Sequence, residues 1–280
     1  MSMSKSLAEP KPSQPLSTSL NFSTTIPTFA PMEFSIQSLS PIQWAILLLA
    51  ALFIGMAKGG ISNLGMSVVP LTAWYFGGKF STGLILPMLI VADFTAVLYY
   101  RKNAEWKYYW KLLPWTIVGV VFGTWLGQVV DDWLFKRIMG VIFAGSVAFM
   151  LYRDYRGITT IPQQWWFAAC MGILAGVTTM FGNLAGAATT VFFLAMQLPK
   201  QSYLGTAAWF FFSINLVKTP FQIFFWGTIS WDTIQINLLL VPVLLFGVAA
   251  GIWLVQRFSD RFFRRMTISL CIVAMVLLFL

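Results

Sequence analysis

Two apolar stretches of this chain, residues 42–75 and 161–198, are each too long for a single membrane crossing. As continuous helices rising about 1.5 Å per residue, each would measure roughly 50 Å, against a bilayer hydrocarbon core of about 30 Å. Each stretch is interrupted in its middle by glycine and asparagine, at residues 58–65 (KGGISNLG) and 178–186 (TTMFGNLAG). Paired interruptions in two halves of a membrane protein are typical of a binding site near the bilayer midplane.

The rest of the chain also has the composition of a membrane protein. It is 58% hydrophobic and 10% charged and contains no histidine, which leaves too little polar surface for a soluble protein of 280 residues. No charged residue occurs in residues 162–199 or 233–256, and uncharged runs of about 18 residues or more indicate membrane helices. We therefore predict an all-α, multi-pass protein of the cell membrane, in contact with the lipid bilayer.

Residues 1–40 are rich in serine, threonine and proline and contain no apolar run, so we predict a disordered N-terminal tail without a signal peptide. The net charge of +9 comes from basic residues in short loops between apolar stretches. That distribution is typical of cytoplasmic loops, so we predict no nucleic-acid partner. Cys170 and Cys271 lie in separate apolar segments, and without histidine they indicate packing rather than a metal site.

The chain contains an internal repeat. Residues 114–137 align with residues 242–265 with ten of 24 positions identical, and the two segments share a Pro-x4-Gly-x3-Gly-x-Trp pattern. We therefore predict two homologous membrane halves, residues 41–156 and 157–280, each with five apolar pieces. The predicted pieces are 42–57, 62–77, 82–100, 112–130 and 135–152 in the first half, and 163–178, 184–198, 202–225, 234–256 and 266–280 in the second.

The first two pieces of each half form a broken hairpin that either crosses the membrane fully or enters and returns as a re-entrant hairpin. Loop charges indicate how the halves are oriented. Residues 101–111 sum to +3 in the first half, whereas the positive loop of the second half, residues 257–265, follows a different piece of the repeat. Because positive loops remain cytoplasmic, the halves are predicted to be inverted relative to each other. A parallel arrangement would place residues 257–265 outside.

The two breaks supply the predicted substrate-binding residues. Glycine lets the backbone turn and approach a ligand closely, while the helices that restart after each break direct free N–H groups and positive dipole ends at the gap. Two such helix starts facing each other would bind an anion. The alternative is close packing of small residues, which is our interpretation of Gly119 and Gly123. The predicted binding residues are Lys58, Gly59, Gly60, Ser62, Asn63, Thr178, Thr179, Gly182 and Asn183.

Three charged residues interrupt the apolar pieces, and intramembrane charges indicate functional sites. Lys58, at the first break, would balance an anion's charge or extend toward the helix end. Asp93 aligns with Asn215 in the repeat; it would carry protons or form a structural pair with Lys58 or Lys218. Lys218 precedes Pro220 and is predicted to lie beside a helix kink.

Several motifs resemble the TauE/SafE sulfite exporter family. They are residues 57–60 (AKGG) continuing through Gly65 to 70–71 (PL), then Gly83-x3-Pro87 leading to Asp93, then Arg101, Trp106 and the Pro114-x4-Gly119-x3-Gly123 pattern. The resemblance extends over nearly the whole chain after residue 40. It implies a bacterial inner-membrane permease of two related halves, without a cofactor, that moves small sulfur-containing anions such as sulfite or organosulfonates. Ser62 and Asn63 stand where members often have glycine.

Together these features predict a secondary transporter for a small oxyanion or organosulfonate, working by alternating access around the two breaks. An anion channel is the first alternative, and uphill flux would distinguish the two. A membrane enzyme is disfavoured, because no nucleophile–base pair or metal-ligand spacing is visible and no catalytic residue is predicted. A membrane scaffold would show no saturable solute binding. A homo-oligomer is compatible with all of these predictions.

Overall fold

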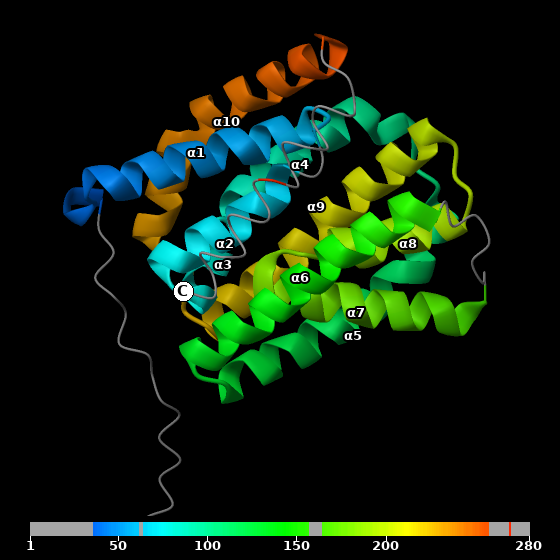
Figure 1. Cartoon of the computed structure of the whole chain (residues 1–280), viewed down its shortest axis with the longest axis horizontal. Helices are drawn as coiled ribbons and strands as arrows, with labels where there is room; N and C mark the ends of the chain where they lie inside the picture. Colours follow the sequence, from blue (N-terminus) through cyan, green and yellow to red (C-terminus); the bar gives the residue numbers. More distant parts are fainter. Residues whose placement is uncertain (1–35, 62–63, 157–163, 258–268, 270–280) are drawn as a thin grey trace, which may run out of the picture. The chain divides into compact units, whose positions relative to one another are not determined.

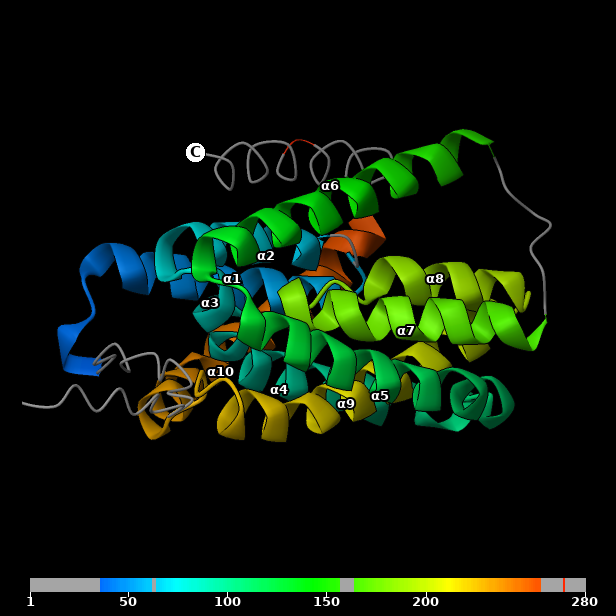
Figure 2. The same ribbon diagram turned by 90° about the horizontal axis from the view of Figure 1, so that it is seen from below.

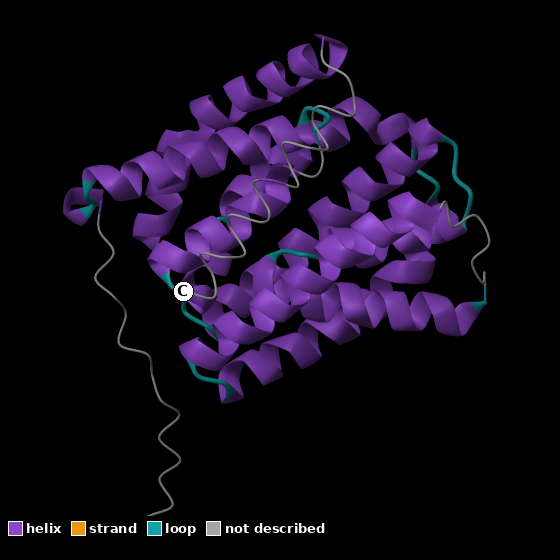
Figure 3. Cartoon of the chain, in the orientation of Figure 1, coloured by secondary structure: helices purple, strands orange, loops and turns teal. Residues whose placement is uncertain are grey.

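Helices make up nearly all of the described part of the chain in the computed structural model (Figure 3). The structure describes residues 36–61, 64–156, 164–257 and 269, and no strand occurs among them. In chain order the elements are η1 (Ile36–Ser38), α1 (Pro41–Lys58), α2 (Leu64–Phe76), α3 (Gly78–Leu84), α4 (Leu86–Tyr100), η2 (Arg101–Asn103), α5 (Trp106–Val129), α6 (Asp132–Arg156), α7 (Trp165–Gly182), α8 (Gly186–Ala195), α9 (Lys200–Phe224) and α10 (Trp231–Arg257).

The predicted interruption of each long apolar stretch is confirmed. Helix α1 begins with a capping box between Ser40 and Gln43 and ends before Gly60, whose φ of 129° is accessible mainly to glycine. Helix α7 ends at Gly182 and is capped by Asn183, which adopts the left-handed conformation with φ 56° and ψ 29°. Both hairpins therefore break where the sequence places residues that tolerate positive φ.

Nine of the ten predicted apolar pieces overlap described helices, and the tenth, residues 266–280, lies outside the described residues except at residue 269. The third predicted piece, residues 82–100, differs in detail. It begins earlier, at Gly78, and divides into α3 and α4 around Ile85. Pro87 lies in the first turn of α4, where its missing N–H and fixed φ favour a helix start over helix continuation.

Helices α2 and α8 are short, with 13 and 10 residues. At the rise of an α-helix they cover about 20 and 15 Å, less than the hydrocarbon core. Their length favours partial crossing over full crossing for the second arm of each hairpin. By length and composition, five stretches of the described chain could cross a membrane: Pro41–Lys58, Gly78–Asn103, Trp106–Val129, Trp165–Gly182 and Trp231–Leu254.

Helices that are distant in the sequence pack along each other in pairs. Helix α1 packs along α10, α7 packs along α5, and α4 packs along α9 (Figures 1 and 2). Glycines lie at two of these helix contacts. Gly55 faces Gly247 across the first pair, and Gly176 faces Gly119 across the second. A missing Cβ lets two backbones approach closely, so our interpretation of Gly119 as a packing residue is confirmed.

Gly251 on α10 gives the sharpest test of this packing. A Cβ there would lie 2.6 Å from the carbonyl oxygen of Met56 and 2.9 Å from its Cα, and backbone atoms of a helix cannot move aside. We expect Gly251→Ala to lower the free energy of unfolding by about 1–3 kcal/mol, measured by thermal unfolding of purified protein. Gly145→Ala on α6 is the matched control, because its Cβ would meet no atom within 4 Å. Equal melting temperatures for the two variants would contradict the packing role.

Two apolar clusters hold the helices together. The first cluster contains side chains mainly from helices α5, α6, α7, α8 and α9, including Phe135, Phe181 and Phe210. The second contains side chains from α1, α2, α4 and α10, including Leu47 and Ile54. The hairpin α1–α2 thus contributes mainly to the second cluster, and the hairpin α7–α8 contributes mainly to the first. The helix breaks of both hairpins lie where the two clusters adjoin, and a cavity lies there.

Candidate functional site

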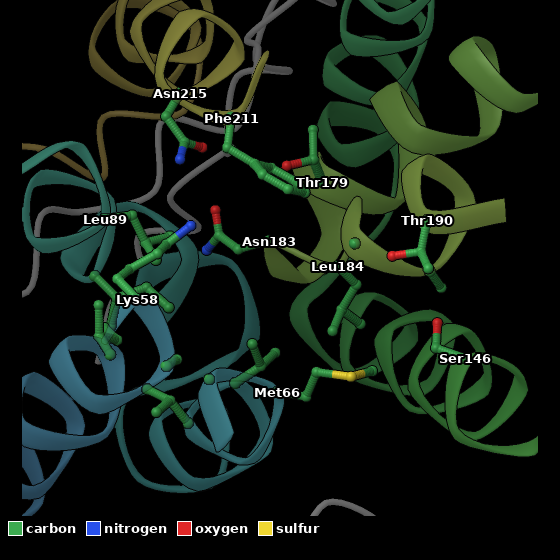
Figure 4. Close-up of a pocket in the computed structure, with 18 of the residues that line it drawn as sticks. Lys58, Met66, Leu89, Ser146, Thr179, Asn183, Leu184, Thr190, Phe211 and Asn215 are labelled. Atoms are coloured by element: carbon green, nitrogen blue, oxygen red, sulfur yellow. The ribbon is translucent and has the colours of Figure 1, made fainter. Parts of the chain in front are cut away.

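Both helix breaks line a single cavity of about 220 Å³ (Figure 4). The first break contributes Lys58 at the end of α1 and Gly65 at the start of α2. The second contributes Thr179 and Asn183 at the end of α7, and Gly186 at the start of α8. Segments about 120 residues apart in the sequence therefore face the same space.

The starts of α2 and α8 both border this cavity. The first turn of any helix carries backbone N–H groups without an intrahelical acceptor, and the helix dipole places positive partial charge there. Gly186 faces open space, since a Cβ at this position would meet no atom within 4 Å. The cavity is thus bordered by two helix N-termini, an arrangement that favours an anion.

Asn183 connects three helices at the second break. Its Nδ2 donates a hydrogen bond to the carbonyl oxygen of Thr82 on α3 (3.3 Å), and its Oδ1 accepts one from Lys218 Nζ on α9. Its backbone N–H donates to the carbonyl oxygen of Thr179, which closes the last turn of α7. The left-handed backbone of Asn183 and both ends of its side chain are therefore fixed in place.

Lys218 is completely buried beside the cavity wall. Its ammonium donates hydrogen bonds to Thr179 Oγ1 (3.1 Å), to the Thr179 carbonyl oxygen (3.3 Å) and to Asn183. All three acceptors are neutral, and no carboxylate of the described residues is within ion-pair distance of it. When protonated, this buried amine directs its positive charge at the end of α7, where its hydrogen bonds to Thr179 and Asn183 stabilise it.

Lys58 lies on the other side of the break and forms an ion pair with Asp93 on α4. Asp93 is fully buried and also accepts a hydrogen bond from Asn215 Nδ2 (2.7 Å), its repeat counterpart on α9. Lys58 is 23% exposed and lies over the ring of Phe211, 4.9 Å from its centroid. Of the two pairings that the sequence allowed for Asp93, the structure forms the one with Lys58.

The three intramembrane charges therefore do not cancel. Lys58 lines the cavity, whereas Lys218 and Asp93 are buried behind its wall; when both amines are protonated, two lysines accompany one carboxylate, which leaves one excess positive charge. A charge in a low-dielectric interior is costly unless compensated. A bound anion would supply the missing negative charge.

Other predicted binding residues lie away from the cavity. Gly59 packs against α10, where a Cβ would lie 2.9 Å from Gly251 Cα, and Gly182 packs against Val69 and Leu184. Gly60 forms the turn after α1. Thr178 donates its hydroxyl hydrogen bond to the carbonyl oxygen of Leu174 in its own helix (2.8 Å). Ser62 and Asn63 lie outside the described residues.

Sequence reasoning missed three hydroxyl groups that line the cavity. Ser146 comes from α6, Thr190 from α8 and Tyr203 from α9, and the hydroxyls of the last two lie 3.2 Å apart. Figure 4 places Thr190 and Ser146 on the side away from Lys58. Isolated Ser and Thr in apolar helices carry no special sequence signal, because they often bond to their own helix, as Ser146 does to Ile142.

The part of the chain that the structure describes is an all-helical bundle with five stretches long and apolar enough to cross a membrane, which defines a multi-pass membrane protein. The chain belongs to the TauE/SafE sulfite exporter family, whose family model matches residues 47–278. This membership confirms the resemblance seen in the sequence and identifies the protein as a membrane transporter of the cell membrane by class. No match was found among curated proteins or among solved structures.

Proposed function

We propose that the protein is a secondary transporter for a small sulfur-containing anion, such as sulfite or an organosulfonate, that binds between the two helix breaks. The observation that carries the proposal is the convergence of both breaks on one cavity, which Lys58 lines and behind whose wall Lys218 is buried. Helix N-termini and ammonium groups are the donors that bind compact oxyanions. In this proposal Lys218, Asn183 and Thr179 form one wall of the site, and Lys58 forms the other.

Ser62 and Asn63 belong to the same proposal through the sequence alone, as donors from the first break. Asp93 would compete with the substrate for Lys58, because one ammonium cannot pair fully with both. Exchange of Lys58 between Asp93 and the anion would link substrate binding to the charge state of the carboxylate. This linkage is our proposed route for coupling to an ion gradient.

The proposed mechanism is alternating access by two inverted repeats. Its support is the reciprocal packing of α1 with α10 and of α7 with α5, through glycines at equivalent repeat positions. In transporters of this kind, the fixed site lies at the repeat interface and the repeats rock around it. The contact between Asp93 and Asn215, which are equivalent positions of the two repeats, would lie near such an axis.

The experiment is uptake of radiolabelled sulfite into liposomes that contain the purified protein, with and without an imposed proton gradient. We expect wild-type protein to accumulate sulfite against its concentration gradient. Asn183→Gly should reduce uptake by about 10- to 100-fold, because it removes a hydrogen-bond partner of a charged group while glycine keeps the left-handed backbone without strain. The rates of initial uptake measure the effect.

Gln197→Gly is the matched control for this variant. Gln197 is also left-handed, with φ 52°, and its side chain is exposed outside the cavity, so uptake should remain at the wild-type rate. Equal uptake by Asn183→Gly and Gln197→Gly would refute the role of Asn183. Sulfite flux that never exceeds equilibrium under any gradient would indicate an anion channel instead.

A further inference from the structure

A second cavity of about 340 Å³ lies between α6, α7 and α8. We name it the side chamber. Its wall is formed mainly by aliphatic and aromatic side chains and includes Gly145 and Phe149 from α6, Leu174 from α7 and Val191 from α8. Leu174 is 47% exposed and Gly145 is exposed, so the chamber reaches the outer surface of the helices. In a membrane this surface faces hydrocarbon.

The polar side chains of the chamber wall are already satisfied by their own helices. Ser146 Oγ donates to the carbonyl oxygen of Ile142 (2.8 Å), and Thr178 Oγ1 donates to that of Leu174 (2.8 Å). A buried water needs two to four polar partners, and apolar cavities that lack them stay dry. A hydrocarbon chain suits such a space better than water or a second ion.

The side chamber adjoins the cavity between the helix breaks. Four residues line both spaces: Ser146, Phe149, Leu184 and Ala187. Leu184 directly follows Asn183, so the shared wall begins one residue from the proposed anion contact. A molecule with its charged group at Asn183 would therefore place an apolar tail in the chamber by displacing side chains of this shared wall, of which Leu184 is the nearest in sequence to Asn183.

We propose that the transporter accepts amphiphilic sulfonates, with the charged head between the helix breaks and the alkyl chain in the side chamber. This inference rests on the proposed function, since it assumes that the anion site binds a sulfur oxyanion. It adds a substrate class that the charged cavity alone does not require. It also assigns a role to the wall formed by α6, which the anion site does not explain.

The test is competition between labelled sulfite and methane-, butane- and hexanesulfonate, with the purified protein in lipid nanodiscs. For the wild type we expect affinity to rise about two- to fourfold for each added methylene, the gain typical of burying a CH₂ group. Gly145 lines the side chamber and a Cβ there would meet no atom within 4 Å, so Gly145→Phe adds a ring at the chamber wall without a clash at its Cβ. In this variant the chamber no longer accepts the alkyl chain, so the affinities for hexanesulfonate and methanesulfonate should lie within roughly twofold of each other.

Ala148→Phe is the matched control. Ala148 lies on the same helix, is exposed, and lines neither cavity, so its affinity ratio should equal that of the wild type. Because partition of long chains into lipid is the same for every variant, the comparison isolates the side chamber.

Two results would overturn the inference while leaving the proposed function intact. One is equal affinity for all three sulfonates in wild-type protein that does bind sulfite, as expected if bilayer lipid permanently fills the chamber. The other is a rise with chain length that Gly145→Phe does not reduce. Failure of the wild type to bind either sulfite or methanesulfonate would instead refute the proposed function, and this inference with it.

Discussion

Replacement of Lys218 by methionine is expected to lower the affinity for sulfite by about 100-fold, which corresponds to about 2.7 kcal/mol. Lys218 on α9 is fully buried against the end of α7, and no carboxylate of the described residues lies within ion-pair distance of it. Its loss removes the excess positive charge and frees Thr179 and Asn183 from the ammonium that orients them. Equilibrium binding of labelled sulfite to protein in nanodiscs measures the change.

Methionine retains most of the length and apolar volume of lysine, so the helix packing around α9 should survive. A buried charge replaced by an apolar side chain of similar size is often neutral for stability, and size-exclusion chromatography would report whether the variant folds. Lys102→Met, at an exposed position in η2, is the control and should bind sulfite as the wild type does. Wild-type affinity in Lys218→Met would exclude this lysine from the anion site.

Lys58→Ala is expected to destabilise the protein by about 3 kcal/mol, because it leaves a buried carboxylate without its cation. Asp93 is completely buried and its other described partner, Asn215, is neutral. The exposed fraction of Lys58, 23%, shows that the cavity reaches this pair, so water can partly replace the lysine, and the loss should lie at the low end of the range for broken buried pairs.

The double variant Lys58→Ala/Asp93→Asn separates this charge effect from loss of packing. Asparagine removes the uncompensated charge, so at least half of the lost stability should return; thermal unfolding of both variants in the same detergent gives the comparison. If the single and double variants have equal melting temperatures, the ion pair does not contribute to stability, and Lys58 stabilises the protein through its contact with Phe211. Sulfite binding by the double variant then reports whether Lys58 itself contacts the anion.

The element positions could be predicted from the sequence because the membrane imposes simple rules. Uncharged apolar runs gave the helices, and Gly60 and Asn183 mark the breaks because few other residues tolerate their positive φ. The division between α3 and α4 was missed, although Pro87 signals a helix start. Hydrophobic composition alone cannot show such a division, since both pieces are equally apolar.

The candidate site was only partly predictable. The intramembrane charges and the polar residues of the breaks could be recognised in the sequence, and they include Lys58, Lys218 and Asn183. In the structure, Lys58 and Asn183 line the cavity and Lys218 lies against its wall. Their partners depend on tertiary packing. The sequence could not choose between Lys58 and Lys218 as the partner of Asp93, because either assignment satisfies the same charge count.

The residues on the remaining wall had no sequence signal at all. Thr190 and Tyr203 reach the cavity only because α8 folds back beside α7 and the start of α9 contacts α8. Gly59 shows the opposite error: a glycine next to a polar break resembles a ligand-binding glycine, but here its missing side chain admits the backbone of Gly251. Both outcomes follow from contacts between distant segments, which local patterns do not encode.

The most direct test of the account is the position of a bound anion. Crystals of the purified protein soaked with selenite, the selenium analogue of sulfite, would locate it by anomalous scattering. We predict one strong peak in the cavity between the starts of α2 and α8, within hydrogen-bonding distance of donors from the second break. A peak elsewhere, or none in crystals of protein that binds labelled sulfite, would contradict the claim that the two helix breaks together form the substrate site.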